Sequence, residues 1–146
     1  MRYIGLVALL VLTACSASTD NHSERQPPIS WAEVDVESLN ALVEKAVAAE
    51  EPWTASPLLS VIHLLGGDTD ARSVVFEETK NRGEGADEAA ITCIRDGLMD
   101  DSVRGIWHEV VMRRSPDGTW RVSEARAAYR CWRAEDREVF QGSPCP

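Results

Sequence analysis

The stretch VRGIWHEVVMRR–SPDG–TWRVSEARAAYRCW, residues 103–132, decides the fold of this 146-residue chain. Apolar and polar residues alternate on either side of a proline followed by Asp-Gly, which is the strongest turn signal in the sequence. The pattern predicts two antiparallel strands, about Val103–Arg114 and Thr119–Trp132, joined by the tight turn Ser115–Gly118.

The second of these strands changes face partway along its length. Trp120 and Val122 share one face, but the apolar series resumes at Ala125 and Ala127, one residue out of step. A β-bulge adds one residue to a strand, bends it and curls the sheet. We therefore expect a bulge near Ser123–Glu124.

Two further strands are predicted upstream. Arg72–Thr79 and Glu88–Arg95 carry apolar residues with a period of two. The connector Lys80–Asp87 contains two glycines and suits a hairpin loop. Together the four segments predict a curled antiparallel meander.

Helices are expected before the strands. The better marked one has Ser56 as its N-cap, Pro57 at its first helical position and Gly66-Gly67 at its end. Its body, residues 58–65, is apolar nearly all round, which predicts a helix buried on most sides.

An earlier helix has two candidate starts. Ser30 and Glu33 have the spacing of a capping box, whereas Asp35 is a competing N-cap for a helix from about Glu37 to Glu50. Pro52 ends it. We expect residues 31–146 to form one α+β domain, in which two N-terminal helices pack on a curled four-stranded sheet. This outline is similar to cystatin-like or NTF2-like folds.

The N-terminus carries a lone Arg2, an apolar run from Ile4, and Leu12-Thr13-Ala14-Cys15 directly after that run. This layout resembles the signal peptide of bacterial lipoproteins. The resemblance implies removal of residues 1–14 and acylation of Cys15. The apolar run is shorter than the roughly 20 residues that cross a bilayer. There are two alternatives. The chain could carry an ordinary signal peptide, cleaved among the small residues 14–18, or it could be a cytosolic protein with an apolar start.

An acylated Cys15 predicts a cell-envelope protein, anchored to a membrane and facing the periplasm or the exterior. Ser16 stands where an acidic residue implies inner-membrane retention, which favours the outer membrane in a host that has two. Residues 15–30 have almost no apolar content, so we expect a flexible tether. The net charge of −9 argues against a nucleic-acid partner, because phosphate binding requires a concentrated basic surface.

Three cysteines remain once Cys15 carries lipid. We favour a disulfide between Cys131 and Cys145, because it would hold an irregular tail to the last strand. Closing a loop of this size contributes roughly 3 kcal/mol. Pairing of Cys93 with either of them, or no disulfide, are the alternatives. No two cysteines or histidines stand at metal-ligand spacing, so neither a metal site nor another cofactor is predicted.

The segments Asp100–Gly105, Asp117–Val122 and Arg130-Cys131, together with Cys145, resemble a pattern found in secreted bacterial proteins of uncharacterised function. The resemblance covers the C-terminal third of the chain. It implies a turn, a hairpin, a strand and a disulfide, but no activity.

Motifs that carry chemistry are scarce. His108 lies in mid-strand on an apolar face, and no nucleophile or second titrating group accompanies it, so we predict no catalytic residue. His63 is expected to be structural as well. The acidic pairs at Asp68–Asp70 and Asp100–Asp101 lack a calcium-binding loop and predict turn roles.

Aromatic and basic side chains of the last two strands form a candidate binding surface for an anionic or carbohydrate ligand: Trp107, His108, Trp132, Arg126 and Arg130. The leading hypothesis is a lipid-anchored, non-enzymatic envelope protein whose sheet contacts a partner protein or an envelope polymer. The alternative is a binding module with a small ligand between core helix and sheet. An enzyme ranks third.

Overall fold

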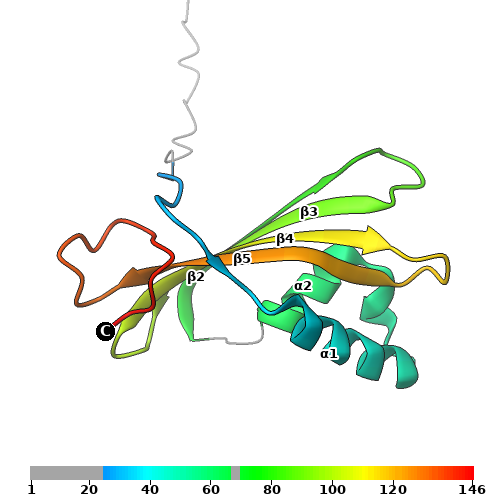
Figure 1. Ribbon diagram of the computed structural model, residues 1–146, viewed down its shortest axis with the longest axis horizontal. Helices are drawn as coiled ribbons and strands as arrows, with labels where there is room; N and C mark the ends of the chain where they lie inside the picture. Colours follow the sequence, from blue (N-terminus) through cyan, green and yellow to red (C-terminus); the bar gives the residue numbers. More distant parts are fainter. Residues whose placement is uncertain (1–24, 67–69) are drawn as a thin grey trace, which may run out of the picture.

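A computed structural model describes residues 25–66 and 70–146 of the chain. It is an α+β fold in which two helices lie on one face of a five-stranded antiparallel sheet (Figure 1). The strands are β1 Ala32–Glu33, β2 Ala71–Lys80, β3 Glu88–Leu98, β4 Val103–Arg114 and β5 Trp120–Cys131. The helices are α1 Val36–Ala48, the short 3-10 helix η1 Pro52–Ala55, and α2 Pro57–Leu65. The fold class expected from the sequence is therefore confirmed.

The sheet contains one strand more than the sequence predicts. Its order is β1-β5-β4-β3-β2, so β2 to β5 form the expected meander and β1 adds to the free edge of β5. Ala32 of β1 pairs with Ala127, and Glu33 pairs with Arg126. A strand of two residues is too short to show an alternating pattern, which is why the sequence did not reveal it.

The start of α1 distinguishes the two predicted caps. Asp35 is the N-cap, and its carboxylate accepts hydrogen bonds from the amides of Glu37 at 3.0 Å and Ser38 at 3.2 Å. The capping box predicted at Ser30 and Glu33 is wrong, because Glu33 lies in β1. Ser56 caps α2 as expected.

The predicted bulge in β5 is confirmed. Val111 pairs with Glu124 and Met112 pairs with Val122, so Ser123 is the extra residue. The Ser123 hydroxyl donates to the carbonyl of Val111 at 3.0 Å. The bulge explains why the apolar series of β5 changes parity.

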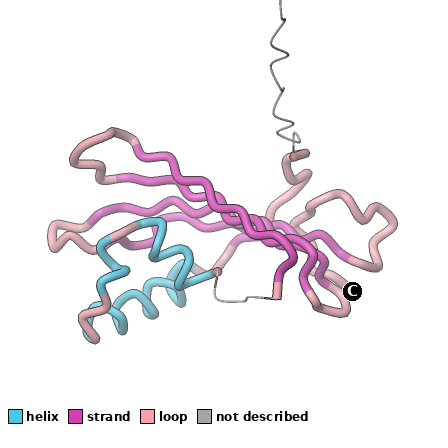
Figure 2. The backbone as a smooth tube through the Cα atoms, turned by 180° about the vertical axis from the view of Figure 1, so that it is seen from behind, coloured by secondary structure: helices cyan, strands magenta, loops and turns pink. Residues whose placement is uncertain are grey.

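The sheet carries a hydrophobic cluster on each face. The two helices lie under one end of the sheet, and the C-terminal segment lies at the other end (Figure 2). On the helix face, Leu39 of α1 and Val61 of α2 pack on strand residues such as Ile91 and Met112, and Val61 and Met112 are fully buried. A smaller cluster on the other face is closed by the two ends of the domain rather than by helices. It contains Ile94, Ala128 and Phe140, with Trp31, Val75 and Trp107 around them.

The predicted signal peptide, Cys15 and most of the predicted tether lie outside the described residues, as do Gly67, Asp68 and Thr69. At the end of the tether, Ile29 donates to the carbonyl of Phe140 at 3.0 Å. Among the described residues, none of the helices is long and apolar enough to cross a membrane.

Candidate binding groove at the end of the sheet

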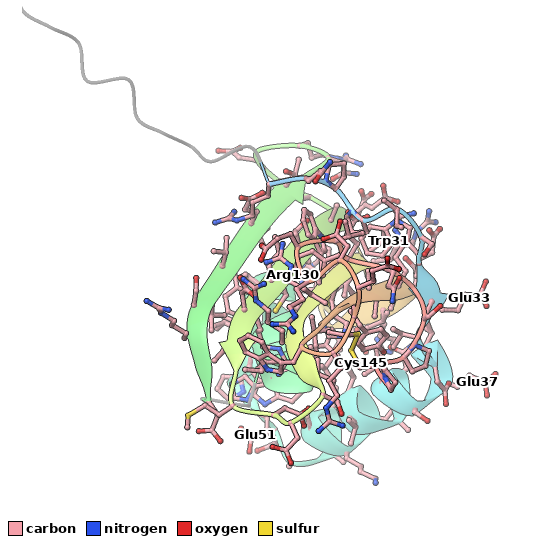
Figure 3. All side chains as sticks on the ribbon, turned by 90° about the vertical axis from the view of Figure 1, so that its left-hand side faces the viewer. Trp31, Glu33, Glu37, Glu51, Arg130 and Cys145 are labelled. Atoms are coloured by element: carbon pink, nitrogen blue, oxygen red, sulfur yellow. A yellow bond between two sulfur atoms is a disulfide. The ribbon has the colours of Figure 1, made fainter. Side chains whose placement is uncertain are left out.

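The C-terminal segment is fixed to the end of the sheet that lies away from the helices. Cys131 and Cys145 form a disulfide with a Cα–Cα distance of 5.4 Å, which is the pairing the sequence favours. Gln141 exchanges hydrogen bonds of 2.7 and 2.9 Å with Tyr129 of β5. Figure 3 looks onto this end of the molecule, where Trp31, Arg130 and Cys145 are labelled. Cys93 is a free, buried thiol on the helix face.

The ends of the domain cover much of the binding surface predicted on the sheet. Trp107 lies edge-on to Trp31, with ring centroids 6.4 Å apart, and edge-on to Phe140 at 5.5 Å. The guanidinium of Arg126 lies over the Trp31 ring at 4.3 Å, and that of Arg130 over the Phe140 ring at 4.2 Å. These contacts hold Trp107 and Arg130 against the smaller core, whereas Arg126 lies over Trp31 and remains exposed.

The arginines of this face are also paired with carboxylates. Arg130 bonds Asp96 at 3.0 Å, and Arg104 lies 3.9 Å from the other oxygen of the same carboxylate. Arg104 also bonds Glu138, and this hydrogen bond lowers the pKa of the Glu138 carboxyl. Arg126 is paired with Glu109. The charges predicted to attract an anion are therefore largely compensated within the domain.

His108 lies on the opposite face from Trp107 and Arg130. It is buried, with 7 % of its surface exposed, and no described residue bonds its Nδ1. Burial, and then the positive charge of Arg95, lower the pKa of His108 to about 4. The imidazole is therefore neutral at physiological pH, and it is separated by the sheet from the other residues of the predicted surface.

Trp132 belongs to the predicted surface and borders a groove at the end of the sheet. It follows β5 directly, is 37 % exposed, and has the Arg104 guanidinium 5.4 Å from its ring centroid. The groove has a volume of about 740 Å³ and lies between the start of β2 and the turn from β3 to β4. Residues that line it include Arg72, Asp96, Leu98, Met99, Asp101 and Trp132.

The β3–β4 turn shapes one wall of this groove. Asp100 caps the turn, since its carboxylate accepts from the amides of Val103 at 2.6 Å and Ser102 at 2.8 Å. These bonds lower the pKa of the Asp100 carboxyl. The turn leaves Met99 88 % exposed at its tip. Asp100 thus has the turn role expected from the sequence.

Sequence reasoning missed Arg72 and Met99 as groove residues. Arg72 reaches the groove only because β2 pairs with β3, a relation that its own neighbours do not reveal. The sequence carries no signal for Met99 either, because single exposed apolar residues are common at protein surfaces.

The described residues contain no group of three or more metal-ligating side chains. Comparisons with protein-family models, with curated proteins and with solved structures found no match to this chain. The function must therefore be inferred from the site itself.

Proposed function

We propose that this protein is a lipid-anchored component of the bacterial cell envelope that binds an envelope carbohydrate polymer in the groove beside Trp132. The anchor is inferred from the lipoprotein-type sequence around Cys15. The single observation that carries the binding function is the partly exposed indole of Trp132 in the wall of a groove of about 740 Å³.

The composition of the groove favours a carbohydrate over a purely apolar ligand. An indole offers a flat apolar surface with a polar edge, which suits the mixed apolar and hydroxyl faces of a sugar ring. Arg72 and Asp101 border the same groove, and no described residue forms a side-chain hydrogen bond or ion pair with either. They supply a donor and an acceptor for hydroxyl groups.

The small-ligand alternative has less support. A ligand between α2 and the sheet would have to displace Val61, Ile91 and Met112, which are almost completely buried there. Opening a cavity of that size in a packed core costs several kcal/mol. The groove at the end of the sheet requires no such displacement.

Cosedimentation tests the proposal. The full-length protein in detergent is mixed with insoluble cell-wall polymer from a bacterial host, and the bound fraction is measured. We expect Trp132→Ala to lower that fraction strongly. Trp53→Ala is the matched control, because Trp53 stacks on His63 at 4.9 Å in the helical half of the domain. Failure of the unaltered protein to bind, or equal binding by both variants, contradicts the proposal.

A further inference from the structure

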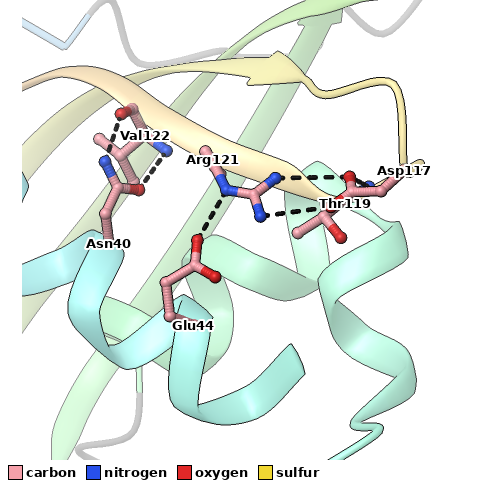
Figure 4. A network of polar contacts seen from close by, with 6 residues as sticks. All are labelled: Asn40, Glu44, Asp117, Thr119, Arg121 and Val122. Atoms are coloured by element: carbon pink, nitrogen blue, oxygen red, sulfur yellow. Dashed lines mark hydrogen bonds and ion pairs between the residues drawn. The ribbon is translucent and has the colours of Figure 1, made fainter. Parts of the chain in front are cut away.

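The two edges of the sheet are treated differently by the fold. At the β5 edge, β1 and Gln141 pair with the strand, and the amide of Asn40 bonds both main-chain groups of Val122 at 2.9 Å (Figure 4). At the other edge, no described segment pairs with β2 along its ten residues. Unpaired edge strands are templates for adding another strand, and proteins usually block them.

Two hydrogen bonds establish which groups of β2 face outward. The amide of Asn81 donates to the carbonyl of Glu88 at 3.1 Å, so odd-numbered residues near the end of β2 point toward β3. On the other side of β3, the amide of Arg114 donates to the carbonyl of Asp87 at 2.9 Å. Odd-numbered residues of β3 therefore point toward β4 and even-numbered ones, such as Glu88, toward β2, which agrees with the first bond. The main-chain groups of the even-numbered residues Val74, Phe76 and Glu78 therefore face away from the sheet.

We propose that two copies of this chain associate through β2, which pairs antiparallel with itself about a two-fold axis at Val75. Val74 then lies opposite Phe76 of the second copy, and these central pairs exchange about four main-chain hydrogen bonds. Arg72 lies opposite Glu78 of the second copy, twice by symmetry. Opposite charges directly across a pair of strands are stabilising.

Charge complementarity selects this register over its neighbours. Moving the axis one residue toward the C-terminus sets Arg72 against Lys80, which places like charges opposite each other and is destabilising. Moving it one residue toward the N-terminus sets Arg72 against Phe76, which removes the attraction between Arg72 and Glu78. With the axis at Val75, the charged pairs within β2 are attractive.

The apolar surface that β2 exposes in a single chain is consistent with a second copy covering this edge. Val74 is 42 % exposed although it is an apolar residue in the middle of a strand. Val75 packs beside the smaller core on the opposite face, and its counterpart would extend that core across the axis.

A two-fold axis at a strand pair stands perpendicular to the sheet, so both N-terminal segments leave from the same face. Two lipid anchors, if the proposed anchor is correct, can then enter one membrane.

Cysteine crosslinking tests the pairing in the full-length chain, expressed in bacterial cells and treated with an oxidant. Val75 faces its own copy in a pair whose Cα atoms lie about 4.5 Å apart, within disulfide reach. Val75→Cys should therefore give a product of twice the chain mass. Ser73→Cys is the matched control on the same face, because its two copies would be about 13 Å apart.

Charge reversal separates the pairing from random collision. In the Val75→Cys background, Arg72→Glu alone and Glu78→Arg alone should each lower the yield of the product several-fold. The double variant Arg72→Glu/Glu78→Arg should restore it, which also shows that the altered strand still folds. Equal crosslinking by Val75→Cys and Ser73→Cys, crosslinking to a different protein, or no effect of charge reversal overturns the proposal. Glycan binding is measured with Trp132→Ala, in which β2 is unaltered, so either proposal can fail alone.

Discussion

The side-chain amide of Asn40 takes the place of a neighbouring strand for Val122. Its Nδ2 donates to the Val122 carbonyl and its Oδ1 accepts from the Val122 amide, both at 2.9 Å. One residue of helix α1 thus satisfies both outward-facing main-chain groups of Val122 just before the bulge. The contact links helix position to sheet edge across 82 positions of sequence.

Replacing Asn40 with leucine should destabilise the domain by about 1–3 kcal/mol, because both Val122 groups lose their partner. Urea unfolding followed by circular dichroism measures this. Glu44→Gln, one turn further along α1, is the control: it removes only the charge from an exposed contact with Arg121 of 2.8 Å and should cost less than about 0.5 kcal/mol. Equal effects of the two variants contradict the assigned role of Asn40.

The disulfide should matter most for the smaller core. Cys145→Ser frees the segment that carries Phe140, and we expect a loss of roughly 3 kcal/mol in the free energy of unfolding. Trp107 should become more accessible to a fluorescence quencher, because Phe140 is one of the two rings that cover it. Reduction of the unaltered protein should reproduce the change. An unaltered unfolding midpoint after reduction argues against this expectation.

The sequence could predict the parts of the fold that depend on local periodicity. The turn at Ser115–Gly118 and the bulge at Ser123 are each indicated by the residues immediately around them, and the structure confirms both. The strand β1 could not be predicted, since two residues show no period. The cover on Trp107 could not be predicted either, because the segment that contains Phe140 has no repeating pattern.

The candidate site was predictable only in part. Trp132 was predicted as part of a binding surface, and it is partly exposed and borders the groove. His108 was grouped with Trp107 although they are adjacent in a strand, and adjacent strand residues point to opposite faces. Arg72 and Trp132 line the same groove because of how the strands pair. That pairing register could not be predicted from a single sequence.

The anchor prediction is tested by Cys15→Ser. We expect the variant to lose labelling by a radioactive or clickable fatty acid and to leave the membrane fraction. Cys93→Ser is the control, because a buried thiol should not carry lipid, and that variant should stay with the membrane. Retention of Cys15→Ser in membranes with unchanged labelling would show that the lipoprotein interpretation is wrong.

The pH dependence of stability should report the burial of His108. Its folded pKa of about 4 lies below the ordinary value of 6.5, so the unfolded chain takes up a proton first as the pH falls. Stability contributed by the neutral imidazole is therefore complete above pH 6.5 and is lost progressively as the pH drops toward 4. Between pH 7 and pH 5 the loss should be on the order of 2 kcal/mol.

His108→Gln isolates this contribution from the carboxylates that titrate in the same range. We expect the variant to be less sensitive to pH, losing about 2 kcal/mol less than the unaltered protein between pH 7 and pH 5. His63→Gln is the control for the loss of a histidine as such, because His63 is exposed on α2. Unfolding curves at the two pH values give the comparison. Parallel pH profiles for His108→Gln and the unaltered protein would mean that the imidazole is hydrated in solution, and its burial beside Arg95 would have to be revised.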